Sequence, residues 1–197
     1  MAIVPVVDSG EGLYHHRSRV TPAHQQPGLR NNAHIGPIRL DRDLQVRASG
    51  MTSFSDFSAG PSVVIGGSET NQWSADLAKG SRFQLARLNG RSVIVDRQTN
   101  QAVCAKPQPW DTPALQDCAL VTRLRQPTTG HPVLLAAGLD HYGTYAVGEF
   151  VTDPRLLLPV LAAAPTGWES KNLQILYRVD RLRDGVGAPQ LQAIHVW

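Results

Sequence analysis

Two apolar runs that end in glycine constrain the fold of this chain more than any other feature. The run PSVVIGG spans residues 61–67, and the run HPVLLAAG spans residues 131–138. Short continuous apolar runs are typical of strands that are covered on both faces, as in the parallel centre of a sheet. We therefore expect 61–66 and 132–138 to lie in the middle of one sheet, parallel to each other.

A helical pattern follows each of these runs. In the segment SETNQWSADLAKG, residues 68–80, Ser68 suits the N-cap and Gly80 suits the C-terminal stop. Residues 142–165 are also predicted to be helical, with a break before Pro154, because proline fits the first turn of a new helix. Each apolar run is thus expected to begin a strand–glycine–helix unit.

The remaining patterns predict further strands. The dipeptide Asn89-Gly90 lies between two strand-like runs and is a strong signal for a β-hairpin over 82–97. The proline-rich stretch 100–116 is predicted to be a loop. Strand patterns also occur at 44–49, at 117–138 (two strands around the turn PTTG), at 171–185 and at 190–197.

Strands that interleave with helices indicate an α/β class. We predict a three-layer, Rossmann-like domain with a mixed sheet, in which hairpins at 83–95 and 172–196 add antiparallel edges. The single domain is expected to cover residues 44–197. Residues 1–43 have no periodicity and are predicted to form an irregular N-terminal arm, whose histidines are too irregularly spaced for a metal site: His15, His16, His24 and His34.

The composition is that of a globular protein, with 42% hydrophobic and 18% charged residues. The net charge is only +3 and no basic stripe is present, so we do not expect this chain to bind nucleic acid. No run approaches the roughly 18 apolar residues of a membrane span. The N-terminus lacks the basic region of a signal peptide, and a cytoplasmic location is the default expectation.

Two cysteines, Cys104 and Cys118, lie fourteen positions apart. They have no paired histidines nearby and do not form a zinc motif. We interpret them as small, unpaired apolar residues, with Cys118 an inert core thiol. A disulfide between them requires Cα atoms within about 7 Å of each other.

Several long motifs resemble a family of uncharacterised bacterial proteins. They include ALVTRLRQPTTGHPVLLAAGLDHYGTYAVGEFVTDPRLL and APTGWESKNLQILYRVDRLRDGVGAPQLQAIHVW, and the resemblance covers about residues 44–197. The resemblance implies a Rossmann-like α/β domain, of a kind often attached to an N-terminal membrane helix or a winged helix. It implies no particular activity. Family members usually carry a further strand and helix before the SFSDF segment, where this chain has its irregular arm.

The two strand–glycine–helix junctions are the candidate ligand site. Glycine allows close approach of a ligand, and a helix N-terminus offers free N–H groups to an anion. In open α/β sheets the binding crevice lies beyond the carboxyl ends of the strands. Turning the chain explains the same residue types equally well. The candidate ligand-binding residues are Gly66, Gly67, Ser68, Asn71, Gly138, Asp140, His141, Gly143 and Thr144.

These observations favour a non-catalytic sensor or interaction domain that binds a small anionic ligand and has no cofactor or metal. One alternative is a hydrolase or transferase that uses Asp140 and His141, although adjacent residues usually point apart and no nucleophile motif is present. Another is a structural or partner-binding module that assembles through an exposed sheet edge. We interpret Arg178, Arg181 and Arg183 as charges that protect such an edge.

Overall fold

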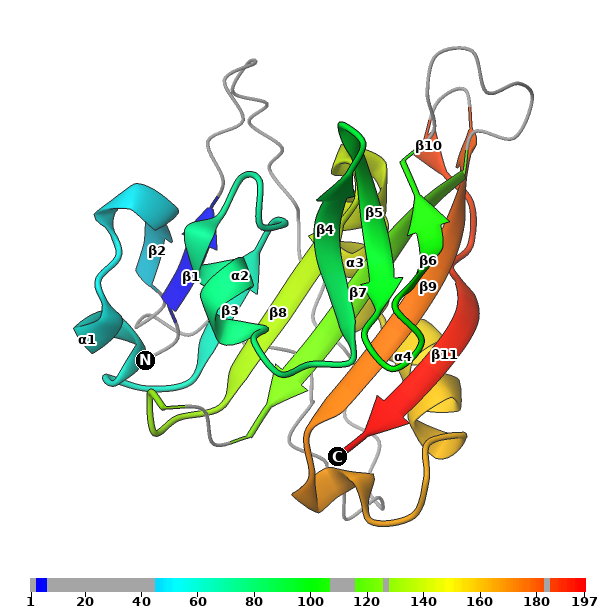
Figure 1. Cartoon of the computed structure of the whole chain (residues 1–197). Coiled ribbons are helices and arrows are strands. Elements are labelled where there is room, and N and C mark those ends of the chain that lie inside the picture. The colour runs from blue at the N-terminus through cyan, green and yellow to red at the C-terminus, as the bar shows by residue number, and fades with distance from the viewer. Residues whose placement is uncertain (1–2, 7–44, 107–115, 126–127, 183–184) are drawn as a thin grey trace.

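The structure is a computed structural model that describes residues 3–6, 45–106, 116–125, 128–182 and 185–197 (Figure 1). Its largest unit, which we call the main sheet, contains β1 (Ile3–Val6), β2 (Gln45–Ala48), β3 (Ser62–Ile65), β7 (Gln116–Leu124), β8 (Val133–Gly138), β9 (Leu173–Leu182), β10 (Gly185–Val186) and β11 (Gln190–Val196). The strand order is β10-β9-β7-β8-β3-β1-β2, and β11 also pairs with β9.

The parallel centre of the main sheet confirms the prediction from the two apolar runs. β3 and β8 pair in parallel, with Val64 opposite Leu135, and β1 and β2 extend this parallel part. β7 is antiparallel to both of its neighbours, β8 and β9. β11 is antiparallel to β9, so the predicted C-terminal hairpin does form the edge next to β7.

Two helices cover one face of the main sheet, α3 (His141–Thr152) and α4 (Pro154–Ala162). The break between them lies where proline predicted it, and the Asp153 carboxylate caps α4 by accepting a hydrogen bond from the amide of Arg155 at 2.9 Å. Phe150 and Leu157 pack against the buried β9 side chains Ile175 and Tyr177 in a common apolar cluster.

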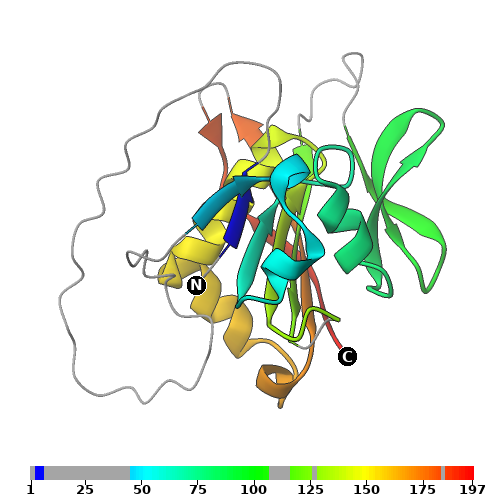
Figure 2. The same cartoon turned by 90° about the vertical axis from the view of Figure 1, so that its left-hand side faces the viewer.

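A second, three-stranded antiparallel sheet covers the opposite face, and Figure 2 shows the main sheet between it and the helices. This small sheet contains β4 (Phe83–Leu88), β5 (Arg91–Asp96) and β6 (Gln101–Ala105). The predicted hairpin turn is present, because Asn89 and Gly90 both have positive φ, at 51° and 76°. Phe83 and Ile94 pack against the main-sheet residues Leu120 and Leu176.

The predicted three-layer Rossmann-like fold is wrong. Of the described residues, 42% lie in strands and 26% in helices, and helices cover only one face of the main sheet where β7–β9 lie. The hairpin at 83–95 was expected to extend a sheet edge, but it packs on the sheet face. The reason is that β5 is buried from Val93 to Asp96, so its side chains need cover on both sides.

Three local predictions also need correction. Residues 101–105 were predicted to be in a loop but form β6, and residues 3–6, assigned to the irregular arm, form β1. The helix after β3 is short, α2 (Gln72–Leu77), and its N-cap is Asn71 rather than Ser68. The SFSDF segment contains a short helix, α1 (Phe54–Phe57). The four histidines of the arm lie outside the described residues.

Two cross-links fasten the small sheet to the main sheet, and neither was expected. Cys104 of β6 and Cys118 of β7 form a disulfide, with their Cα atoms 6.4 Å apart, so the prediction of unpaired cysteines is wrong. The buried Gln174 amide on β9 both accepts from the Phe83 amide and donates to the Phe83 carbonyl, at 2.8 Å each, and also donates to the Thr122 hydroxyl at 2.9 Å.

No helix in the described part of the chain has the length and apolar character needed to span a bilayer.

Candidate functional site

A pocket of about 330 Å³ lies where the loop after β3, the loop after β8 and the small sheet meet. It brings together segments about 70 positions apart in the sequence, as expected if both strand–glycine–helix loops open on one crevice. Seven of the nine predicted ligand residues line the pocket: Gly66, Gly67, Ser68, Gly138, Asp140, His141 and Thr144. Its volume is at the lower end of the range for small-molecule sites.

The two predicted residues outside the pocket lining, Asn71 and Gly143, have structural roles. Asn71 is buried, accepts a hydrogen bond from the Trp73 amide at 3.1 Å and donates one to the Ile65 carbonyl at 3.1 Å. Gly143 is buried against Asp117, and a Cβ atom there would lie 2.8 Å from the Asp117 Oδ2. Substitutions at either position would therefore disturb the fold rather than report on a ligand.

Thr144 belongs to the pocket lining but also braces the loop. Its hydroxyl accepts a hydrogen bond from the Gly138 amide at 2.9 Å and donates one to the Asp140 carbonyl at 3.2 Å. These bonds join the end of β8 to the first turn of α3, so this wall of the pocket is held in place by the chain itself.

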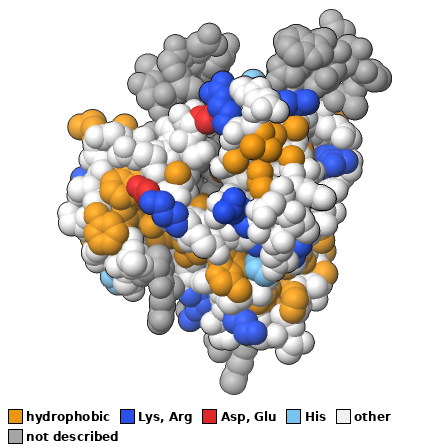
Figure 3. Space-filling model, viewed as in Figure 1, with side chains coloured by type: hydrophobic (Ala, Val, Ile, Leu, Met, Phe, Trp, Pro, Cys, Tyr) orange, Lys and Arg blue, Asp and Glu red, His pale blue; other side chains and the backbone are white. Residues whose placement is uncertain are grey.

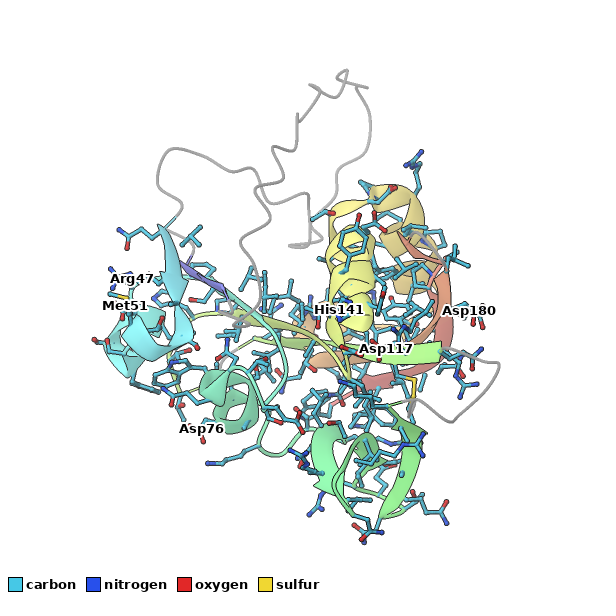
Figure 4. All side chains as sticks on the ribbon, turned by 90° about the horizontal axis from the view of Figure 1, so that it is seen from above. Arg47, Met51, Asp76, Asp117, His141 and Asp180 are labelled. Carbon is cyan, nitrogen blue, oxygen red and sulfur yellow. A yellow bond between two sulfur atoms is a disulfide. The ribbon has the colours of Figure 1, made fainter. Side chains whose placement is uncertain are left out.

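The loop after β8 and the first turn of α3 form one wall of the pocket, which we call the α3 wall. Asp117 does not line the pocket but holds this wall in place, and the sequence did not single it out. Its carboxylate is fully buried and accepts hydrogen bonds from the amides of Gly143 at 2.6 Å, Cys118 at 2.7 Å and Asp140 at 3.1 Å. Burial raises the pKa of Asp117, and these hydrogen bonds only partly offset that effect. Figure 4 shows Asp117 close to His141, at the start of α3.

Two internal carboxylates thus take the hydrogen-bond donors that were expected to bind an anion. In addition to Asp117, Asp140 is the N-cap of α3 and accepts from the His141 amide at 2.8 Å. Both carboxylates place negative charge at this helix N-terminus. A free anion is therefore disfavoured at the α3 end of the pocket.

Asp140 and His141 do contact each other, contrary to the expectation that adjacent residues point apart. The Asp140 Oδ1 lies 2.8 Å from the His141 Nδ1, and the Asp140 Oδ2 lies 3.4 Å from the Lys106 Nζ. Burial raises the pKa of Asp140, but the hydrogen bonds from His141 and the charge of Lys106 outweigh it, and the net pKa lies below the usual value. Asp140 is therefore a carboxylate at neutral pH.

The small sheet supplies a wall that sequence reasoning missed. Leu85 and Ala86 of β4 line the pocket with apolar surface, and Lys106 and Ser92 add polar groups. The Ser92 hydroxyl donates to the Glu69 carboxylate at 2.9 Å, which fastens the β3 loop to β5. No local signal marks these residues as site residues, because they reach the pocket only through the packing of the small sheet on the main sheet.

The β3 loop retains free hydrogen-bonding groups. Gly66 adopts a φ of 101°, which glycine tolerates and which turns the chain into the loop. Within the described part of the chain, the amides of Ser68 and Glu69 and the Ser68 hydroxyl form no hydrogen bond. These groups belong to pocket-lining residues and are available to a ligand.

The described residues contain no group of three or more His, Cys, Asp or Glu side chains that could hold a metal ion. The pocket contains a carboxylate-bound imidazole, an ammonium group, hydroxyls and free amides. Together these groups can form hydrogen bonds and ion pairs with a polar molecule from several sides.

Comparison with protein-family models, with curated proteins and with solved structures finds no match for this chain. The resemblance to the uncharacterised bacterial family therefore stays a prediction.

Proposed function

We propose that this chain is a non-catalytic ligand-binding module, a sensor or interaction domain that holds one small molecule in the pocket between the β3 loop, the β8 loop and the small sheet. The observation that supports it best is the convergence of two distant strand–glycine–helix loops on one pocket of about 330 Å³. The pocket lies at the carboxyl ends of two parallel strands, where open sheets commonly bind ligands.

The charges around the pocket modify the ligand class expected from the sequence. Glu69 and Asp140 are acidic, Lys106 is basic, and the buried Asp117 adds negative charge beneath α3. A purely anionic ligand would face repulsion at the α3 wall. We infer a small ligand with an apolar body and both donor and acceptor groups, such as a zwitterion, whose anionic end faces the β3-loop amides and Lys106.

The test is thermal unfolding of the purified chain with amino acids, sugars, nucleotides and simple anions. A ligand present at a hundred times its dissociation constant adds about 2.7 kcal/mol to the free energy of unfolding. Ala86→Phe would fill the pocket from β4 and abolish the shift, whereas Ala102→Phe, at an exposed position of the same small sheet, would leave it unchanged. A shift that survives Ala86→Phe would place the ligand elsewhere and refute the proposal.

One observation favours a second function, hydrolysis or group transfer. The bond between Asp140 and the His141 Nδ1 orients the imidazole and leaves its Nε2 available as a base, while the Ser68 hydroxyl lines the same pocket. His141 is 73% exposed in its side chain, so His141→Ala is expected to keep the fold. If the wild type turns over a bound ligand and His141→Ala does not, the catalytic alternative is established. If the ligand binds without being turned over, catalysis is excluded for that ligand.

A further inference from the structure

A second depression, separate from the pocket, lies next to Cys118 of the disulfide. It is a groove of about 280 Å³ between the small sheet and the β9–β11 hairpin. Its apolar lining includes Phe83, Val103, Leu176 and Ala193, and the disulfide-bonded Cys118 also lines it. The groove shares none of its lining residues with the ligand pocket described above.

One half-buried charge in this groove has no counter-ion among the described residues. Arg178 of β9 lines the groove, and within the described residues its guanidinium forms no ion pair and no hydrogen bond. The sequence interpretation placed Arg178 on a solvated sheet edge, but its strand is covered by the small sheet on this face. None of its guanidinium nitrogens is fully buried, so the group is accessible from the groove and can pair with a carboxylate that enters it.

A second arginine in the groove is held rigidly. The Arg82 Nε and Nη2 donate to the two carboxylate oxygens of Asp96, at 3.0 and 2.7 Å. This fork raises the pKa of Arg82 and lowers that of Asp96, so both stay charged. The groove therefore contains two guanidinium groups and one carboxylate, and the carboxylate is fully engaged.

The surface around the groove also carries more positive than negative charge. In the space-filling view, Lys and Arg side chains are more frequent than acidic ones over the face formed by the small sheet and the β9–β11 hairpin (Figure 3). A register shift between Leu191 and Ala193 interrupts the β9–β11 pairing next to the groove. Gln192, between them, is exposed and bonds only weakly to its own strand, at 3.3 Å, so its amide is free to turn toward a ligand.

We propose that this groove is a binding site for a small organic carboxylate with an aliphatic body. The carboxylate pairs with the Arg178 guanidinium, whose planar fork matches two carboxylate oxygens, and the Gln192 amide donates a further hydrogen bond. The aliphatic part lies along Val103 and Ala193. The site is independent of the function proposed for the first pocket.

The test is a titration of the wild-type chain with hexanoate, followed by amide NMR shifts at constant ionic strength. Hexanamide serves as the uncharged probe and inorganic phosphate as the anion without an aliphatic body. We expect hexanoate to cause saturable shifts of the Val103 and Ala193 amides, and hexanamide to cause none. Arg178→Gln should weaken hexanoate binding about 10- to 100-fold.

Arg87→Gln is the matched control, because it removes the same charge from the small sheet at a position that does not line the groove. It should leave hexanoate binding unchanged. Phosphate binding as tight as hexanoate would show a charge effect alone and overturn the aliphatic part. Three results would overturn the site: equal binding of hexanamide, unchanged hexanoate binding in Arg178→Gln, or no saturable shift at Val103 and Ala193. If Arg178→Gln does not fold, the comparison of hexanoate with hexanamide on the wild-type chain decides whether the site exists.

Discussion

The disulfide between Cys104 and Cys118 is the cross-link whose removal should have the clearest effect on the small sheet. It joins residues 14 positions apart, one on each sheet, and Figure 4 shows its yellow bond between the small sheet and β7. Closing a loop of this length in the unfolded chain restricts its entropy and stabilises the fold by about 3 kcal/mol. For a chain of this size the loss lowers the Tm by about 6–12 °C.

The assay is thermal and urea unfolding of the wild type, with and without reductant, and of Cys104→Ala, Cys118→Ala and the double variant. Because either substitution breaks the same bond, each single variant should lose about as much as the double. The buried Cys118 side chain adds a small packing loss to its own variant.

Two results would contradict a stabilising disulfide between Cys104 and Cys118. If thiol titration of the unfolded wild-type chain finds two free thiols, the disulfide does not form. Single losses that sum to the loss of the double variant would show that the cysteines contribute through independent packing. A disulfide that forms spontaneously and carries about 3 kcal/mol would also count against the default expectation of a reducing cytoplasmic location.

Three further perturbations test the packing around the site. Gly143→Ala places a Cβ 2.8 Å from the Asp117 Oδ2 and should lower the free energy of unfolding in urea by about 1–3 kcal/mol. Gly148 lies on the same helix, and a Cβ added there meets no atom within 4 Å, so Gly148→Ala should raise the free energy of unfolding by about 0.5–1 kcal/mol. Gln174→Leu leaves the buried Phe83 amide and carbonyl unpaired and should cost at least about 2 kcal/mol; a smaller loss means that water replaces the side chain. Because burial raises the pKa of Asp117, its protonated form favours the folded state, so its contribution is present below pH 3.8 and is lost as pH rises through the raised pKa. The free energy of unfolding of the wild type should therefore fall with rising pH relative to Asp117→Asn, and a difference that stays constant with pH contradicts the assignment.

Local patterns predicted the elements whose stability is mainly local. The Asn89-Gly90 turn needs positive φ at both residues, and the chain supplies the two residue types that adopt it most readily. Pro154 breaks the helical segment because proline suits the first turn of α4. β3 and β8 were predictable because both are apolar runs bounded by turn residues.

The position of the small sheet was not predictable from these patterns. A hairpin has the same sequence whether it extends a sheet edge or packs on a sheet face, and only its burial by distant residues decides between them. The prolines that follow Ala105 concealed β6, and without β6 no pattern placed Cys104 opposite Cys118. The Rossmann-like prediction failed for this reason, since strands rather than helices cover the second face.

The candidate site was predictable in its two loops and not in its third wall. Glycine and capping residues marked Gly66 and Gly138 from local sequence, and both line the pocket. Leu85 and Lys106 reach the pocket through tertiary packing, which leaves no local signal. Asp117 was missed because it reads as the first residue of a strand, although its carboxylate holds the start of α3.

The most direct test of the proposed function is an amide NMR titration of the wild-type chain and of Ala86→Phe with the compound that gives the largest thermal shift. We expect the amides of the 66–70 loop and of the 138–144 loop to shift together with one dissociation constant, and Ala86→Phe to abolish the response. Shifts confined to one loop, shifts scattered over other surfaces or an undiminished response in Ala86→Phe would contradict it.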